Sequence, residues 1–320
     1  MTEKRPLISI VIPVFNESEG IHQVYEQVCR AIAGLPDPCE IIFVDDGSTD
    51  DTAALIASIA QKTTNVSGIS LSRNFGHQAA LTAGLDVARG DAVVTMDGDL
   101  QHPPDFIPIL VEKWKQGFQV VNTVREDSGR ESLLKRVSSR IYYKILNLVS
   151  EVPIQAGAAD FRLLDRQVVE SLRAIKEHDR FLRGLVSWVG YSSTSVRFTP
   201  GKRYAGKTKY SFVKMFRLAV DGILSFSAVP LRLLLVCGLI ICLLSFVYGS
   251  YSLYVHFFTN ATVPGWTSLL ITILFLGGGQ LIGIGLLGEY LMHIYMESKS
   301  RPLYIIRQSF GGGCERVEKN

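Results

Sequence analysis

One long segment without charged residues restricts what this chain can fold into. Residues 233–288 of the 320-residue chain contain no Lys, Arg, Asp or Glu. The segment holds two apolar stretches, 233–258, which is free of charges apart from His256, and 265–288, which is wholly uncharged. Each exceeds the ~20 residues that a helix needs to cross the hydrocarbon core of a bilayer. The sequence therefore predicts two transmembrane helices that follow a soluble N-terminal part.

Positive charges flank the predicted membrane segment on both sides, whereas the connecting residues 259–264 carry none. These charges are Arg203, Lys207, Lys209, Lys214, Arg217 and Arg232 before the first span, and Lys299, Arg301 and Arg307 after the second. By the positive-inside rule, both ends of the segment face the cytoplasm. We expect a cytoplasmic domain with amphipathic interface helices (1–225), a two-helix transmembrane domain (226–297) and a cytoplasmic tail (298–320). The predicted location is the cytoplasmic (inner) membrane.

The composition fits this division. Hydrophobic residues make up 47% of the chain, which is high for a soluble protein because apolar residues are concentrated in the uncharged segment. The five cysteines form no CxxC pair, so we expect them to be reduced packing residues. Glycines in the second span favour close helix packing within or between subunits, and a homo-oligomer is therefore a further expectation. These glycines are Gly277, Gly278, Gly279, Gly283, Gly285 and Gly288.

The N-terminal part alternates between two patterns. Apolar runs at 7–14, 40–44, 66–71, 92–96 and 120–124 predict buried strands, and helical patterns lie between the first four. This alternation predicts an α/β fold with a mostly parallel sheet, whose ligands bind beyond the carboxyl ends of the strands. Polar clusters follow four of the runs. No Gly-x-Gly-x-x-Gly or Walker lysine loop occurs, which argues against a dinucleotide or P-loop enzyme.

The run at 92–96 ends in two carboxylates that flank a glycine. Residues two apart on an extended chain point to the same side, so Asp97 and Asp99 can face one small volume. Two hard oxygen ligands suit a divalent ion that keeps positions open for phosphate oxygens, as Mg²⁺ or Mn²⁺ does. For these two residues alone, an ordinary acidic turn is the alternative.

Three ordered motifs carry a resemblance to a known family. They are Pro-Val-Phe-Asn-Glu at 13–17, Val-Asp-Asp-Gly-Ser-Thr-Asp at 44–50 and Asp-Gly-Asp-Leu-Gln-His-Pro at 97–103. They resemble the nucleotide-sugar motifs of inverting glycosyltransferases with the GT-A fold. The chain is most similar to polyprenyl-phosphate glycosyltransferases, including dolichyl-phosphate mannose synthases and bacterial undecaprenyl-phosphate glucosyltransferases. The resemblance extends over almost the whole chain, including the two spans.

This resemblance implies a division of roles on the donor side. Asp97 and Asp99 would hold the metal on the donor diphosphate, with Gln101 nearby. The residues implied to line the base and ribose are Pro13, Phe15 and Glu17. Asp45 or Asp46 would accept hydrogen bonds from the base or ribose, although capping of the following helix is the alternative for this pair.

Basic residues are implied to bind phosphates on the acceptor side. The resemblance assigns phosphate contacts to Arg125 and to Lys135, Arg136 and Ser139, which lie in a predicted basic amphipathic helix, 131–150. That helix lies on an anionic membrane surface or packs on the sheet with a solvated basic face, and the two arrangements can coexist. A cationic loop before the first span similarly predicts phosphate binding by Arg203 together with Lys207 or Lys209.

The resemblance assigns Asp160 to the acceptor side of catalysis. A phosphate monoester has its second pKa near 6, so the acceptor oxygen is already an anion at neutral pH. We therefore expect Asp160 to orient the sugar or acceptor and to stabilise charge at the anomeric carbon, more than to remove a proton.

Together these features predict a metal-dependent, inverting transferase that moves a hexose, most simply glucose from UDP-glucose, to undecaprenyl or another polyprenyl phosphate. Transfer from another nucleotide sugar (GDP-mannose or a modified UDP-sugar) and a non-enzymatic membrane scaffold are the alternatives. A processive polysaccharide synthase would need more spans and a Gln-x-x-Arg-Trp motif, which is absent. We expect no nucleic-acid partner.

Overall fold

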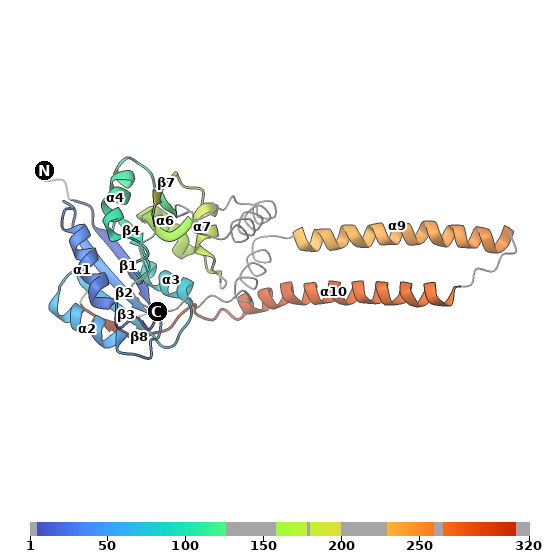
Figure 1. Ribbon diagram of the computed structural model, residues 1–320, viewed down its shortest axis with the longest axis horizontal. Helices are drawn as coiled ribbons and strands as arrows, with labels where there is room; N and C mark the ends of the chain where they lie inside the picture. Colours follow the sequence, from blue (N-terminus) through green and yellow to red (C-terminus); the bar gives the residue numbers. More distant parts are fainter. Residues whose placement is uncertain (1–4, 126–157, 178–179, 200–228, 259–264, 312–320) are drawn as a thin grey trace. The chain divides into compact units, whose positions relative to one another are not determined.

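The computed structural model describes residues 5–125, 158–177, 180–199, 229–258 and 265–311. Two compact units are present. The first contains the described residues up to 199 and those from 301 onwards, and the second contains two long helices. Each unit is considered by itself (Figure 1).

The first unit is built on an eight-stranded sheet with the order β7-β5-β6-β4-β1-β2-β3-β8. The central strands β4, β1, β2 and β3 are parallel, whereas β6 and β8 run antiparallel to their neighbours. The strands are β1 (Ile8–Val14), β2 (Cys39–Asp45), β3 (Val66–Leu71), β4 (Ala92–Thr95), β5 (Val120–Arg125), β6 (Ala158–Asp165), β7 (Ser193–Phe198) and β8 (Ile306–Phe310).

Helices cover both faces of this sheet. On one face, Ile8, Ile10 and Ile12 of β1 share a core with α1 (Ile21–Ile32), α2 (Thr52–Lys62) and α4 (Ile107–Lys115). The short 3₁₀ helix η1 (Pro104–Phe106) leads into α4. On the other face, β1 and β2 pack against α3 (His77–Val87), which contacts α6 (Arg166–Ala174), and α6 contacts α7 (Leu182–Trp188). All seven residues of β1 are buried, as two covered faces require.

The sequence-based prediction of a mostly parallel α/β sheet is confirmed. Each of the five predicted strands is present within two residues of its expected bounds, and helices occupy the intervening segments. Three strands were not predicted, namely β6, β7 and β8. Trp188, the last residue of α7, is 58% exposed and does not belong to the core.

The strand β8 lies after the predicted membrane segment yet belongs to the first unit. It pairs antiparallel with β3, and Ser72 N–H donates a hydrogen bond to the carbonyl of Ile305 (2.8 Å). The Tyr304 hydroxyl donates to Asp86 Oδ2 at the end of α3 (2.8 Å). Residues 306–310 are therefore part of the sheet and not a loose polar tail.

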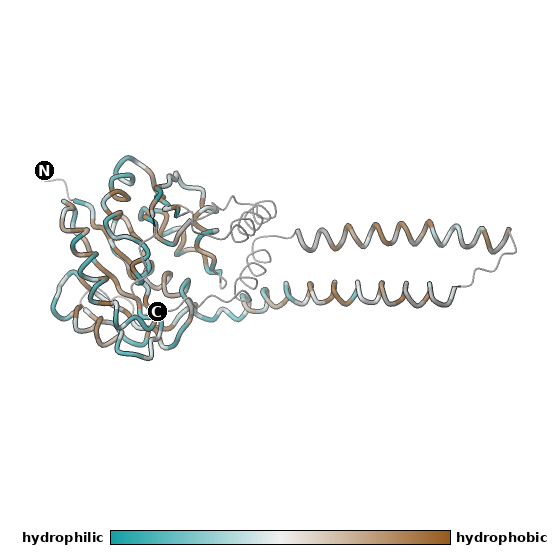
Figure 2. Tube along the Cα trace, viewed as in Figure 1, coloured by the Kyte–Doolittle hydropathy of each residue, from teal (hydrophilic) through white to brown (hydrophobic). Residues whose placement is uncertain are grey.

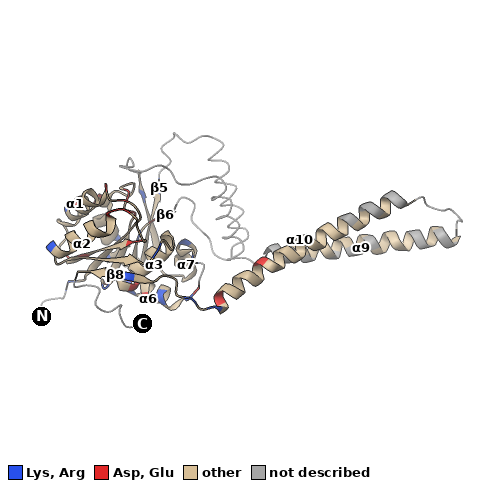
Figure 3. Ribbon diagram, turned by 90° about the horizontal axis from the view of Figure 1, so that it is seen from below, with Lys and Arg blue, Asp and Glu red and all other residues tan. Residues whose placement is uncertain are grey.

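The second unit contains α9 (Val229–Phe258) and α10 (Trp266–Ser298), which contact one another. A Cβ atom at Gly283 would lie 3.0 Å from Leu234 Cδ2, so this glycine permits the close approach of the two helices. Figure 2 shows hydrophobic residues along both helices, and in Figure 3 the acidic residues of α10 lie towards its C-terminal end. Among the described residues, one helical segment, Phe275–Ser298, is long and apolar enough to cross a membrane by length and composition.

Candidate active site

The loops after β1 and β2 are joined by hydrogen bonds at the carboxyl edge of the sheet. Asn16 N–H donates to Ser48 Oγ (2.9 Å), and Thr49 N–H donates to Asn16 Oδ1 (2.8 Å). Glu17 N–H donates to the Thr52 hydroxyl at the start of α2 (3.1 Å). These contacts hold the segment that contains Phe15 and Glu17, two of the predicted nucleotide-binding residues, against the second loop. Pro13 lies within β1 and pairs with Val44 of β2.

Asp45 ends β2, and its carboxylate is buried and bound to the protein. Its Oδ1 accepts a hydrogen bond from Ser48 N–H (3.0 Å), and its Oδ2 accepts one from the Ser70 hydroxyl (2.6 Å). Asp50 accepts a hydrogen bond from Thr52 N–H (3.1 Å) and so satisfies the first turn of α2. The alternative of helix capping therefore does not apply to Asp45.

Asp46 binds the loop that leads into α3. Its two carboxylate oxygens accept hydrogen bonds from Phe75 N–H (2.8 Å) and Gly76 N–H (3.0 Å). Burial raises the pKa of Asp46, although these two N–H groups act in the opposite direction. Next to it, Gly47 adopts a φ of 68°, and a Cβ there would lie 2.3 Å from the Arg73 carbonyl carbon. The loops after β2 and β3 thus meet so closely that only glycine fits at position 47.

The acidic turn follows β4. A Cβ atom at Gly98 would lie 2.6 Å from Val14 Cγ1, so a glycine is needed where this turn crosses the end of β1. Asp99 Oδ1 accepts a hydrogen bond from Gln101 N–H (3.0 Å), which closes the turn locally. The next residue, Leu100, takes a left-handed conformation with a φ of 59°. The three predicted metal-site residues therefore lie in one tight turn.

The buried side chain of His102 holds the backbone of this turn in place. Its ring is 1% exposed, and it stacks on Phe161 with 5.3 Å between ring centroids. Its Nδ1 accepts a hydrogen bond from Asp97 N–H (3.0 Å), so that nitrogen carries no proton. Burial lowers the pKa of His102, which agrees with a neutral ring.

The carboxylate of Asp97 is incompletely satisfied by the protein. Its Oδ1 is buried and has no hydrogen-bond partner among the described residues, although His77 Nε2 lies 3.4 Å away. The described residues hold no cluster of three or more His, Cys, Asp or Glu side chains arranged to bind a metal ion. The donor set of Asp97 and Asp99 fits an ion that takes its other ligands from a diphosphate and water.

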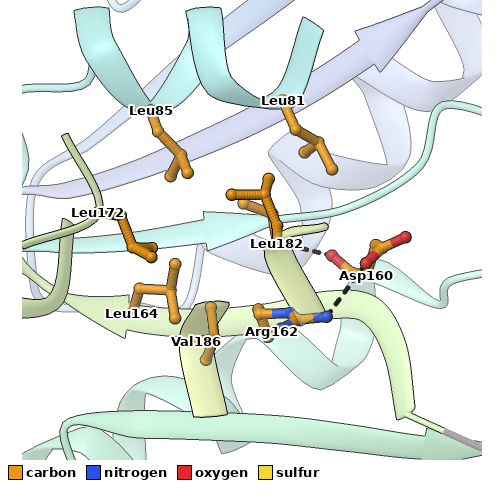
Figure 4. Close-up of a pocket in the computed structure, with 9 residues that line it drawn as sticks. Leu81, Leu85, Asp160, Arg162, Leu164, Leu172, Leu182 and Val186 are labelled. Atoms are coloured by element: carbon orange, nitrogen blue, oxygen red, sulfur yellow. Dashed lines mark hydrogen bonds and ion pairs between the residues drawn. The ribbon is translucent and has the colours of Figure 1, made fainter. Parts of the chain in front are cut away.

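Asp160 lies on β6, beside β4, and its side chain is 7% exposed. The guanidinium of Arg183 donates from Nε to Oδ1 (2.9 Å) and from Nη2 to Oδ2 (2.8 Å). Arg162 Nη2 donates to Oδ1 (3.0 Å), an interaction drawn in Figure 4. Burial would raise the pKa of Asp160, but the nearby His77 imidazole, the hydrogen bonds from Arg183 and the charges of both arginines hold it well below its usual range.

His77 lies between the two carboxylates at the first residue of α3. Its Nε2 is 3.4 Å from Asp97 Oδ1 and 3.7 Å from Asp160 Oδ2. Burial would lower the pKa of His77, but the close Asp160 carboxylate and the negative charge of Asp97 raise it. The predicted donor-side and acceptor-side carboxylates therefore face the same imidazole.

The remaining predicted residues divide into two groups. Arg125 ends β5 and is exposed, and its positive charge acts on His102 beside the acidic turn. The other predicted phosphate-binding residues lie outside the described residues, namely Lys135, Arg136, Ser139, Arg203, Lys207 and Lys209. His77 and Arg183 were not predicted as site residues, because only the fold brings them to the two carboxylates. His102 lies within the motif at 97–103, but its hydrogen bond to the backbone of Asp97 was not predicted.

Comparison with known proteins gives a consistent result. The family model "Glycosyl transferase family 2" matches residues 9–173. A bactoprenol glucosyl transferase of Shigella phage SfV is 44% identical over 94% of this chain and 98% of its own length. An uncharacterized glycosyltransferase of Bacillus subtilis, YkcC, is 41% identical over 98% of this chain and 97% of its own. A solved glucosyl-3-phosphoglycerate synthase of Mycobacterium tuberculosis aligns with a TM-score of 0.45 at 23% identity, over 68% of this chain and 78% of that one.

Proposed function

The chain belongs to glycosyl transferase family 2, and from this premise we propose that it transfers glucose from UDP-glucose to undecaprenyl or another polyprenyl phosphate, with inversion, at the cytoplasmic face of a membrane. Relatives named bactoprenol glucosyl transferase, at 43–44% identity over 94–95% of this chain, support both the sugar and the lipid acceptor. The observation that carries the proposal is the meeting of Asp97 and Asp160 at one imidazole, that of His77.

On the donor side, Asp97 and Asp99 would hold a divalent ion, Mg²⁺ or Mn²⁺, with Gln101 beside it. Such an ion, when bound, neutralises the charge that develops on the departing diphosphate. The buried, unpartnered Oδ1 of Asp97 supports this role, since a buried carboxylate oxygen without a partner is costly. His102 serves the same role indirectly, because it fixes the backbone of Asp97.

The nucleoside would lie over the loops after β1 and β2, near Pro13, Phe15 and Glu17. Asp45 and Asp46 remain proposed ligands of the base or ribose, since a carboxylate oxygen can accept more than one hydrogen bond. Each of their oxygens already accepts a hydrogen bond from the protein. Asp45 and Asp46 would therefore also contribute to binding indirectly, because they fix the conformation of the loops after β2 and β3.

On the acceptor side, Asp160 would act as a fixed anion. Its depressed pKa makes it a poor proton acceptor at neutral pH, and the acceptor phosphate is already ionised. We assign Asp160 the orientation of the reacting groups and the stabilisation of positive charge at the anomeric carbon as the diphosphate leaves. Arg125, Lys135, Arg136, Ser139 and the cationic loop with Arg203, Lys207 and Lys209 are proposed to bind donor and acceptor phosphates.

Membrane attachment would bring the lipid phosphate to this edge. The strand β8 belongs to the same sheet as β1 to β7, so the chain must cross any membrane an even number of times between β7 and β8. If Phe275–Ser298 of α10 crosses, a second crossing is therefore needed, and we assign it to α9. The positive charges that flank the segment support a cytoplasmic sheet, with limits at 1–225, 226–297 and 298–320, of which the last segment returns to the sheet as β8.

A panel of nucleotide sugars tests the proposal. The purified protein in detergent or nanodiscs is incubated with undecaprenyl phosphate and UDP-glucose, GDP-mannose or a modified UDP-sugar, with Mg²⁺ or Mn²⁺. We expect lipid-linked glucose from UDP-glucose and no product in EDTA. A product from another donor alone would replace the sugar in the proposal. Failure to bind or turn over any donor would favour a non-enzymatic scaffold.

A further inference from the structure

Arg183 binds the Asp160 carboxylate in a way that determines its orientation. Two neighbouring N–H groups of one planar guanidinium reach the two carboxylate oxygens, at 2.9 Å and 2.8 Å. A bidentate pair of this kind fixes the plane of the carboxylate as well as its position. Arg162 reaches only Oδ1 among the two oxygens, at 3.0 Å. The plane of Asp160 therefore depends chiefly on Arg183.

Arg183 is itself held in place by the start of α7. Leu182 N–H donates to Gln78 Oε1 of α3 (3.2 Å), which lies next to His77. The side chains of Leu182 and Val186 are buried in a leucine-lined cavity between α3, α6 and α7 (Figure 4). These contacts hold the start and the middle of the short helix, so the guanidinium lies at a defined place while 34% of its side chain stays exposed.

Arg162 and Arg183 differ in what their loss would do. Arg162 lies on the same strand as Asp160, its side chain is 5% exposed, and it also donates to the carbonyl of Ala159 (3.1 Å). It therefore balances a buried charge and braces its own strand. Arg183 comes from a different element, α7, and 34% of its side chain is exposed.

We propose that Arg183 is a positioning residue of the transfer reaction, which fixes the carboxylate plane of Asp160 and acts on the substrates through that carboxylate. The inference rests on the proposed function, because it assigns Asp160 to the acceptor side. It adds a residue on α7 to a site otherwise built from the strand ends and α3.

A double-mutant cycle tests the proposal with Arg183→Lys, Asp160→Asn and the double variant. Lysine keeps the charge but cannot form the two parallel hydrogen bonds. We expect Arg183→Lys to lower kcat by about 10- to 100-fold, with the donor KM changed by no more than about twofold. Asp160→Asn should cost more, and the double variant should lose no more than Asp160→Asn alone. Multiplicative losses would mean that Arg183 contacts a substrate independently and would overturn the proposal, as would an unchanged kcat.

The control is Arg89→Lys. Arg89 also donates two side-chain hydrogen bonds, from Nε (3.0 Å) and Nη2 (2.8 Å), to another buried carboxylate, although both reach one oxygen, Glu40 Oε2, at the opposite edge of the sheet. We expect it to lower the Tm about as much as Arg183→Lys while kcat stays unchanged. An equal loss of kcat in both variants would reduce Arg183 to a stabilising residue and overturn the proposal.

The same four proteins test Arg183 without turnover. If the pair exists in solution, the double variant should lose less Tm than the sum of the losses in the two single variants. A loss in the double variant equal to that sum would overturn the inference. A wild-type protein that transfers sugar from no donor would refute the proposed function instead, whatever the cycle in Tm gives.

Discussion

Three cationic or hydrogen-bonding side chains surround Asp160, and each comes from a different element. His77 begins α3, Arg162 lies on β6 and Arg183 lies on α7. A buried carboxylate in such surroundings is stable as the anion and costly as an isolated charge. The site therefore contains a permanent negative charge next to the acidic turn of Asp97, and this charge needs no proton exchange to function.

The charge of Asp160 should make the protein sensitive to acid. A depressed pKa in the folded state gives stability that is present above the unfolded value, about 3.9. That stability is lost as the pH falls through the folded pKa. We expect Asp160→Asn to be less stable by about 3–5 kcal/mol at pH 7, because both arginines lose their partner. Thermal unfolding from pH 7 to pH 3 should show the deficit shrinking below about pH 4. A deficit that is independent of pH would contradict this account.

The acidic turn should be indispensable for turnover but not for folding. Asp97→Asn and Asp99→Asn keep the size of each side chain and remove a charged metal ligand. We expect each to lower kcat/KM by about 100-fold or more while Tm changes little. Asp105→Asn, an exposed acid after the same turn, is the matched control. EDTA should abolish activity and added Mg²⁺ or Mn²⁺ should restore it, whereas full activity in Asp99→Asn would exclude the metal role.

The sequence identified the acidic turn because its residues are neighbours in the chain. Asp97, Gly98 and Asp99 follow an apolar strand, and their spacing alone puts two carboxylates together. The cations that bind Asp160 are different, since Arg183 is 23 positions away and His77 belongs to another βα unit. An arginine on a short helix reads as an ordinary surface residue until the fold pairs it with a buried acid.

At the scale of elements, the strands differ in how readily they can be predicted from the sequence. The buried strands β1 to β4 are short apolar runs, and every one was predicted. The edge strand β8 has mostly exposed residues, so its pattern lacks an apolar face and resembles a loop. It forms because β3 has an unpaired edge to which it can hydrogen-bond. Since β3 is distant in the sequence, the local pattern of residues 306–310 does not show this pairing.

The attachment of β8 should contribute measurably to stability. Phe310 is partly buried against the core. It lies beside Gly68 of β3, close to Ile56 of α2. We expect Phe310→Ala to cost about 2–3 kcal/mol, which is less than for a fully buried phenylalanine. This loss corresponds to a fall in Tm of several degrees. Gln308→Ala, at an exposed position of the same strand, is the control, and thermal unfolding of the two variants is the measurement. Equal effects would mean that β8 is not docked in solution.

At the scale of the whole molecule, β8 restricts membrane topology, because it decides whether the number of membrane crossings is even or odd. The strands before α9 and the strand after α10 share one sheet, so they must lie on one side of the bilayer. The prediction of two spans from the sequence rested only on the apolar composition of the segment. The sheet adds an independent requirement that the number of crossings be even.

Cysteine labelling tests this parity directly. In a background without the native cysteines, we introduce Thr262→Cys between the two helices and Gln308→Cys in β8. If two crossings occur, a membrane-impermeant maleimide should label position 262 in intact cells and position 308 only after permeabilisation. The reason is that the proposed orientation puts the sheet, and β8 with it, on the cytoplasmic side, whereas the connection between the helices carries no positive charge to retain it there. Position 86, where Asp86 accepts the hydrogen bond from Tyr304, is the internal control, since Asp86→Cys must share the accessibility of β8. Labelling of 262 and 308 from the same side would show that the two long helices do not cross, and the lipid acceptor would then have to reach the site by another route.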